Sequence, residues 1–204
     1  MAVAETISQR HNIVITGFLG SGHEQLAIAV ADLLGRQAVS SYTLFTENAL
    51  RRGDLEYAAD SEIAVLNAML ERDEPLVLDV RASTFCRTDA QAAIKKLGAL
   101  TAFLDIPSMA CSRGLASMQL HDLERAAAES ELGMYTFGSV GDATQNAADV
   151  VVSPRLTDNM PAIAGTLVND FAQHDGLLVP ALAGGSTART AVVSRGATIL
   201  QFPR

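Results

Sequence analysis

The residues of this chain with the clearest chemical spacing lie in the stretch "GFLGSGHE", residues 17–24. Gly17 and Gly22 keep the spacing of the phosphate-binding pattern G-x-x-x-x-G-K-[ST], in which backbone N–H groups wrap a phosphate at a helix N-terminus. Gly20 and Ser21 complete a loop of the right length. The stretch therefore predicts a phosphate site.

Two positions of this stretch depart from the pattern. His23 stands where the lysine is expected, and Glu24 stands where the serine or threonine is expected. Histidine is shorter than lysine and is mostly uncharged near pH 7, so most of the fixed positive charge is lost. A carboxylate about 4 Å from a phosphate charge, at an effective dielectric near 20, is repelled by about 4 kcal/mol.

The two departures leave three interpretations of the loop open. In the first, the carboxylate of Glu24 excludes a phosphate. In the second, Glu24 is a magnesium ligand that bridges the loop to a phosphate, because carboxylates bind Mg²⁺ well. In the third, the glycines serve a tight chain reversal and hold no ligand, and His23 is not a phosphate ligand.

The elements that must position this loop are a strand and a helix. "NIVIT", residues 12–16, is a β-branched apolar run that predicts a buried strand. Apolar residues follow helical spacing over residues 23–34, and Gly35 is well placed to end the helix. The sequence predicts a strand, a glycine loop and a helix in that order.

The rest of residues 12–174 alternates between further strands and helices. Apolar runs predict strands at 38–44, 75–80, 100–107 and 148–154, and helical patterns predict helices at 61–71, 89–98, 107–118, 120–131 and 158–174. Residues 132–146 contain glycines and are interpreted as a loop, and Asp158 or Asn159 is the expected cap of the last helix. This order predicts an α/β fold with a five-stranded parallel sheet flanked by helices.

Two of these strands end in aspartates that are candidates for chemistry. Asp79 ends the third predicted strand and is the candidate catalytic residue, because an acid beside a phosphate loop can act as a base or orient magnesium-bound water. Asp105 ends the fourth strand in the same way. The alternative for both is that strand-end aspartates cap turns.

Residues 175–204 differ in character from the preceding segment. Gly184, Gly185 and Ser186 indicate a linker, and "TAVVS" and "ATILQF" are two short β-rich pieces. They are expected either to pack as an edge hairpin or to bind a partner protein by strand addition. We therefore expect an N-terminal arm at 1–11, one domain at 12–174 and a C-terminal extension at 175–204.

Composition limits the class of protein. The 204 residues are 49% apolar and 19% charged, without a long uncharged apolar run or a recognisable secretory signal, so a soluble cytoplasmic protein is expected. Cys86 and Cys111 are far apart and are expected to be reduced. A net charge of −8 opposes nucleic-acid binding.

The chain resembles the shikimate kinase family of P-loop small-molecule kinases over residues 12–174. "IVITGFLGSG" followed by "AVADLLG" is similar to the opening strand, loop and helix of that family. "SEIAVLNAMLERDEPLVLDV", "LTAFLDIPSMACSRGLA" and "AADVVVSP" are similar to later segments. The resemblance implies a three-layer P-loop kinase-like fold, ATP or ADP with Mg²⁺ as cofactors, and Arg113 as a further residue of the phosphate site.

Most of the charged residues that the family uses are missing. The acids expected after the second strand are absent from "VSSYTLF", the substrate arginine is absent from "EYAAD", and "DVRAS" replaces a glycine triplet. Shikimate is therefore not the expected substrate, and His23 and Glu24 weaken the expectation of ATP and Mg²⁺.

Two functions remain after these losses. The first is a degenerate relative without kinase activity, acting as a binding, scaffolding or regulatory module. The second is an ATP-dependent phosphotransferase for another small metabolite, with Asp79 as base or metal anchor and Glu24 as metal ligand.

Overall fold

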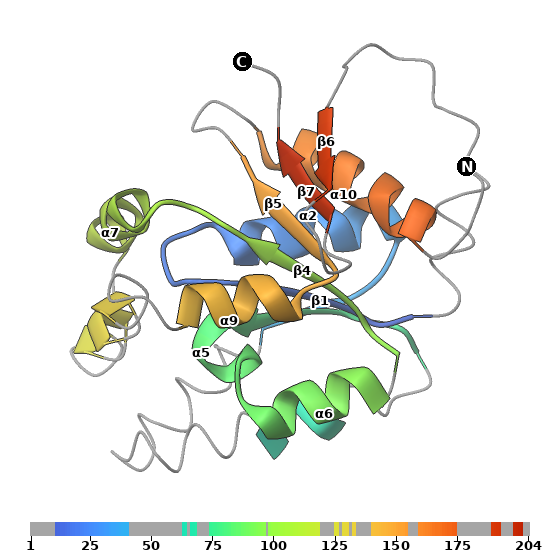
Figure 1. Cartoon of the computed structure of the whole chain (residues 1–204), viewed down its shortest axis with the longest axis horizontal. Helices are drawn as coiled ribbons and strands as arrows, with labels where there is room; N and C mark the ends of the chain where they lie inside the picture. Colours follow the sequence, from blue (N-terminus) through green and yellow to red (C-terminus); the bar gives the residue numbers. More distant parts are fainter. Residues whose placement is uncertain are drawn as a thin grey trace.

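The computed structural model describes one sheet with helices on both faces (Figure 1). The described residues are 11–40, 63–64, 66–68, 74–96, 98–118, 125–126, 128–130, 132–133, 140–154, 159–174, 189–192 and 198–201. All structural statements below concern these residues.

Five parallel strands form the central part of the sheet, in the order β2-β3-β1-β4-β5. They are β1 Ile13–Gly17, β2 Ala38–Ser40, β3 Val77–Arg81, β4 Leu100–Leu104 and β5 Val150–Ser153. This confirms the predicted α/β fold and the five parallel strands. The second strand was expected at 38–44, and residues 41–44 lie outside the described part.

Two more strands from the C-terminal segment extend the sheet beyond β5. β7 Thr198–Gln201 pairs in parallel with β5, and β6 Arg189–Val192 pairs antiparallel with β7. The sheet therefore has seven strands, and the two β-rich pieces at the end of the sequence form an edge hairpin on it. Whether this segment also binds a partner stays a prediction.

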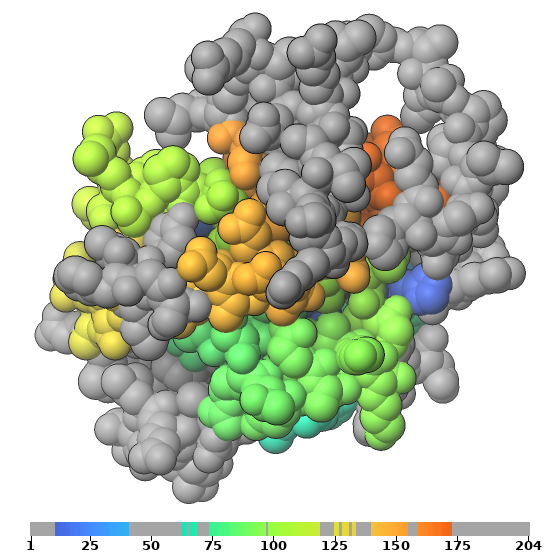
Figure 2. All heavy atoms as spheres, viewed as in Figure 1, coloured from blue at the N-terminus to red at the C-terminus, as the bar shows by residue number. Residues whose placement is uncertain are grey.

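The helices cover the two faces of the sheet in separate groups. α2 His23–Leu34 and α10 Met160–His174 pack on one face, in one hydrophobic cluster. α5 Ala82–Phe85, α6 Thr88–Lys96 and α9 Val140–Ala147 belong to the other face. Figure 2 shows the atoms of α9 and α6 next to each other on that face. α7 Ser108–Ser117 follows β4 at the carboxyl edge of the sheet (Figure 1).

Alternation along the strands decides which side chains meet which helices. Ile13 and Ile15 of β1 pack with α2 and α10, whereas Val14 packs with the opposite cluster. In β3, Val77 faces α2, and Leu78 and Val80 face away. Because successive strand residues alternate, Asp79 must lie on the α2 face of the sheet.

The structure corrects the sequence prediction in two places. Residues 132–146 were interpreted as a loop, but they contain most of α9. Val140 and Thr144 are one helical turn apart, and Thr144 is buried with its hydroxyl 2.7 Å from the carbonyl oxygen of Val140, so helical spacing is present despite the glycines. The segment "DVRAS" ends in the short helix α5, which was not predicted.

Smaller predictions also have an outcome. Asn159 caps α10, since its Oδ1 accepts a hydrogen bond of 2.9 Å from the backbone N–H of Ala162. Cys86 and Cys111 form no disulfide with each other. Among the described helices, none combines the length and the apolar composition needed to cross a bilayer.

Candidate functional site

The candidate site is built around the loop that joins β1 to α2. Gly20 and Gly22 have φ angles of 81° and 88°, in the left-handed region that favours glycine. Gly22 is the N-cap of α2, and the N–H of Ser21 donates to the carbonyl oxygen of Phe18 at 2.9 Å. The predicted strand, loop and helix are confirmed, and the loop lies at the carboxyl edge of a parallel sheet, where such folds commonly bind ligands.

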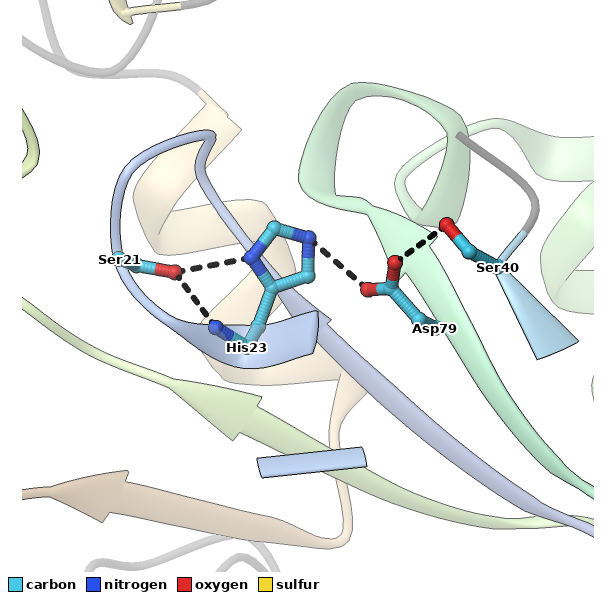
Figure 3. A network of polar contacts seen from close by, with 4 residues as sticks. All are labelled: Ser21, His23, Ser40 and Asp79. Atoms are coloured by element: carbon cyan, nitrogen blue, oxygen red, sulfur yellow. Dashed lines mark hydrogen bonds and ion pairs between the residues drawn. The ribbon is translucent and has the colours of Figure 1, made fainter. Parts of the chain in front are cut away.

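A chain of polar side chains runs from this loop into the sheet (Figure 3). The hydroxyl of Ser21 lies 3.0 Å from Nδ1 of His23. Nε2 of the same imidazole lies 3.0 Å from Oδ1 of Asp79. The hydroxyl of Ser40 donates to the other oxygen of Asp79, Oδ2, at 2.8 Å. Thus two residues that the sequence singled out separately, His23 and Asp79, are in direct contact.

The strand register explains why these side chains meet. Asp79 pairs with Ile15 of β1 on one side and with Ser40 of β2 on the other. Side chains of paired residues on neighbouring strands lie on the same face. That face is covered by α2, whose first residue is His23, so both His23 and Ser40 reach the carboxylate.

The network is buried, which constrains its chemistry. Ser21, His23 and Asp79 are only 6%, 4% and 3% exposed. A buried carboxylate is costly unless polar partners compensate for lost water, and His23 and Ser40 supply them. The contact between His23 and Asp79 has the distance of an ion pair, but its atoms are not aligned as a hydrogen bond.

The contacts also assign the hydrogens of the imidazole. A carboxylate beside Nε2 favours a hydrogen on that nitrogen, which leaves Nδ1 to accept from Ser21. The backbone N–H of His23 points at the oxygen of Ser21 at 3.4 Å. The hydroxyl of Ser21 can therefore accept from the backbone and donate to the imidazole.

Protein atoms occupy the space beside each loop glycine. A Cβ at Gly17 would lie 2.7 Å from Oγ of Ser21, and one at Gly22 would lie 2.8 Å from Cε of Met160. A Cβ at Gly20 would collide with the backbone of α7. Packing therefore favours glycine at positions 17 and 20, and the φ angle of 88° favours glycine at position 22, whether or not a ligand approaches the loop.

A cavity of about 210 Å³ lies beside the loop, between α2 and α7. It has apolar and polar walls, and Glu24 supplies its one charged carboxylate. The lining residues are Leu19, Gly20, Gly22, His23, Glu24, Gln25, Gly114, Ser117 and Met118. Arg113, the other predicted residue of a phosphate site, is exposed on α7 next to Met109 and does not line the cavity.

Glu24 was predicted to bind a metal ion, and the described residues place no metal-binding group of side chains around it. Within the described residues, no group of three His, Cys, Asp or Glu side chains could hold a metal ion. Asp105, the other strand-end acid, is half-buried and 3.4 Å from the hydroxyl of Ser153. This contact joins the ends of β4 and β5, as expected for an acid with a structural role.

Sequence reasoning missed two residues of the site. Ser40 was not singled out, although its place in a strand next to Asp79 was the signal that could have found it. Gly114 packs against Gly20 and lines the cavity, and nothing in its sequence surroundings distinguishes it from an ordinary helical glycine.

Comparison with solved structures shows which known proteins share this fold. The chain is similar to the shikimate kinase from Acinetobacter baumannii in complex with shikimate, with a TM-score of 0.62 and 14% identity, over 83% of this chain and 97% of that chain. A gluconokinase from Sinorhizobium meliloti matches with a TM-score of 0.59 and 13% identity, over 84% and 99%. A shikimate kinase from Bacteroides thetaiotaomicron matches with a TM-score of 0.59 and 17% identity, over 82% and 99%.

These likenesses establish structural similarity to P-loop small-molecule kinases at low sequence identity. No protein-family model and no curated protein matches the sequence. At such identities the similarity concerns the fold, and the function must be inferred from the site.

Proposed function

We propose that this chain is a degenerate relative of the P-loop small-molecule kinases that works as a binding or scaffolding module and does not transfer phosphate. The observation that carries the proposal is the contact between His23 and Asp79. His23 stands at the position of the phosphate-binding lysine, and its ring is held by Ser21 and Asp79 inside the protein. Its two ring nitrogens therefore do not face a nucleotide.

Charge and packing at the loop support the same proposal. Glu24 places a carboxylate in the cavity wall, where it would repel a phosphate group. The backbone of α7 and the side chain of Met160 fill the space beside Gly20 and Gly22. Asp79, the candidate base of an active kinase, is 3% exposed and contacts His23 and Ser40, so it is poorly placed to meet a substrate hydroxyl.

The cavity beside the loop and the C-terminal segment are the two places where binding would occur. The cavity is suited to a small ligand because its volume is about 210 Å³. The C-terminal strand β6 ends the sheet within the described residues, so its outer edge is the place for strand addition by a partner protein. We place this role in the cytoplasm, where thiols such as those of Cys86 and Cys111 stay reduced.

Titration with nucleotide tests the proposal directly. ATP and ADP are added to the full chain with and without Mg²⁺, and binding is followed by calorimetry and by the shift in melting temperature. We expect no saturable binding at millimolar nucleotide and no melting shift. Micromolar binding that requires Mg²⁺ would contradict the proposal and favour the alternative, a phosphotransferase for another small metabolite.

A further inference from the structure

A second cavity, of about 370 Å³, lies at the amino ends of β4 and β5. The loop between β1 and α2 lies at the opposite edge of the sheet, where the strands end (Figure 1). Proteins bind small molecules in cavities of about 300–1,000 Å³, and this volume is within that range. We propose that the second cavity binds a small zwitterion with a short apolar body, the chemical class of the free aliphatic amino acids. This site is separate from the cavity beside the loop and from the edge of β6, and it does not depend on the binding role proposed above.

Two opposite charges line this cavity without being paired. They are the ammonium group of Lys95 in α6 and the carboxylate of Asp149, which directly precedes β5. Within the part of the chain that the structure describes, the ammonium group of Lys95 makes no ion pair or hydrogen bond, and Oδ1 of Asp149 accepts none. A ligand that carries one ammonium and one carboxylate group would supply both missing partners.

Thr101 holds the carboxylate of Asp149 in place. Its backbone N–H and its hydroxyl donate to Oδ2 of Asp149 at 2.9 and 2.8 Å. Its hydroxyl oxygen also accepts from the backbone N–H of Asp149 at 2.8 Å, and Thr101 is only 3% exposed. Because both donors of Thr101 meet the same carboxylate oxygen, Oδ1 is left to accept from an ammonium group. A carboxylate that is already fixed loses little conformational freedom when a ligand binds.

Lys95 supplies a charge that can adjust to the ligand. It is exposed on α6, and the flexible four-carbon stem of a lysine lets its ammonium group follow the position of a carboxylate. Exposed ion pairs contribute little to binding, because water screens them. Asp149 should therefore contribute more to the affinity than Lys95.

The same cavity has an apolar wall. Ile94 and Leu100, which are 3% and 8% exposed, contribute to it together with Ala99 and Ala147. The small alanine side chains leave room for a short aliphatic chain, and contact with this wall removes the chain from water. A ligand with two charges and an aliphatic body therefore fits the lining better than a bare ion.

Titration followed by NMR tests the proposal on the full chain. The zwitterionic probe is L-leucine. Leucinamide and 4-methylpentanoate share its apolar body but carry only the ammonium or only the carboxylate group. The variants are Asp149→Asn and Lys95→Gln. Lys96→Gln and Asp142→Asn are the matched controls, because Lys96 on α6 and Asp142 on α9 are exposed outside the cavity.

We expect leucine to bind the wild type with a dissociation constant of about 1 mM or below. It should shift the backbone amide signals of Thr101 and Asp149 and leave those of residues 17–24 unchanged. Asp149→Asn should weaken binding about tenfold and Lys95→Gln about 2–5-fold, since a hydrogen bond to a fixed charged group contributes more than an exposed ion pair. Both control variants should bind leucine like the wild type, and leucinamide and 4-methylpentanoate should bind more weakly than leucine.

The location of the signal shifts is measured on the wild type, so a variant that fails to fold leaves the test valid. The proposal would be overturned if leucine shows no saturation at about 10 mM, or if the shifted signals lie away from the second cavity. Binding of leucinamide or 4-methylpentanoate as tight as that of leucine would also overturn it, as would an equal loss in Lys95→Gln and Lys96→Gln.

Discussion

Gly20 of the loop and Gly114 of α7 lie backbone against backbone, so closely that neither position has room for a side chain. A Cβ at Gly20 would lie 2.8 Å from the backbone nitrogen of Leu115, and a Cβ at Gly114 would lie 2.9 Å from the carbonyl carbon of Gly20. Carbon atoms normally stay about 3.5–4.0 Å apart, so both contacts would be repulsive. The contact between the glycines fixes α7 against the loop.

The first prediction uses Gly114 and a matched glycine. Replacing a mid-helix glycine by alanine usually stabilises a protein by about 0.5–1 kcal/mol. Gly165 in α10 has no atom within 4 Å of a new Cβ, so Gly165→Ala should show that gain. Gly114→Ala should instead destabilise by about 1–3 kcal/mol, because overpacking must push α7 away from the loop. Urea unfolding measures the change in the free energy of unfolding for each variant. Equal changes for Gly114→Ala and Gly165→Ala would contradict the close contact between Gly20 and Gly114.

The second prediction concerns the pair His23 and Asp79. When two residues are in direct contact, the effects of replacing each on the free energy of unfolding do not add. His23→Gln and Asp79→Asn should therefore show a coupling free energy of about 1–3 kcal/mol in a double-mutant cycle. The control pairs His23→Gln with Asp149→Asn. Asp149 accepts hydrogen bonds from Thr101 at the other end of the strands, so its effect should add to that of His23→Gln. A coupling free energy near zero for His23 and Asp79 would show that their contact is not formed in solution.

The fold was largely predictable because its strands are apolar and its glycine loop is distinctive. β1, β3, β4 and β5 are almost entirely buried, and strands covered on both faces appear in a sequence as continuous apolar runs. α9 was missed because its buried side chains are few and small, with only Thr144 fully buried, so the apolar signal is weak. Residues with weak burial patterns cannot be assigned from periodicity alone.

The candidate site was predictable residue by residue but not as an arrangement. His23 and Asp79 were each identified from motif position, yet their contact depends on which face of β3 lies against α2. Alternation from Val77 would have given that face once the helix was placed. The contact of Gly20 with Gly114 depends on how α7 docks, and no local pattern encodes that docking.

The third prediction is a pH dependence at Asp170 in α10. Burial raises the pKa of Asp170 from 3.8 to about 6. The folded state therefore holds this proton more tightly than the unfolded state, so the free energy of unfolding falls as pH rises from about 4 to 6. Because the side chain is only partly buried, solvent screening should reduce the loss to about 1 kcal/mol. Asp170→Asn should remove this loss.

Unfolding measured at pH 4.5 and pH 8 tests this prediction. Asp170→Asn should match the wild type at pH 4.5 and exceed its stability at pH 8. Asp32→Asn is the control, since Asp32 is exposed on α2. If the difference in unfolding free energy between Asp170→Asn and the wild type is the same at both pH values, the carboxylate of Asp170 is solvated in the folded state.

The fourth prediction concerns the C-terminal strands. β7 pairs with β5 over four residue positions, so deleting residues 175–204 exposes the edge of β5. We expect a loss of about 1–3 kcal/mol, seen as a melting temperature lower by about 2–4 °C per kcal/mol. Removal of 202–204 alone leaves the pairing intact and serves as control. If the deletion leaves the melting temperature unchanged but an associated protein is lost in size-exclusion chromatography, residues 175–204 would instead be a segment that docks to a partner.

The fifth prediction reverses the two substitutions in the phosphate loop. His23→Lys restores a cation, and Glu24→Ser removes a repulsion of about 4 kcal/mol, so the double variant should bind MgATP at millimolar concentration or below. Calorimetry should detect no binding by the wild type or by His23→Lys alone, because Glu24 still lines the cavity there. If the double variant stays inert at a native melting temperature, charge is not the cause of exclusion. The block would then lie in the packing of Cys111 against Gly20 and of Met160 against Gly22.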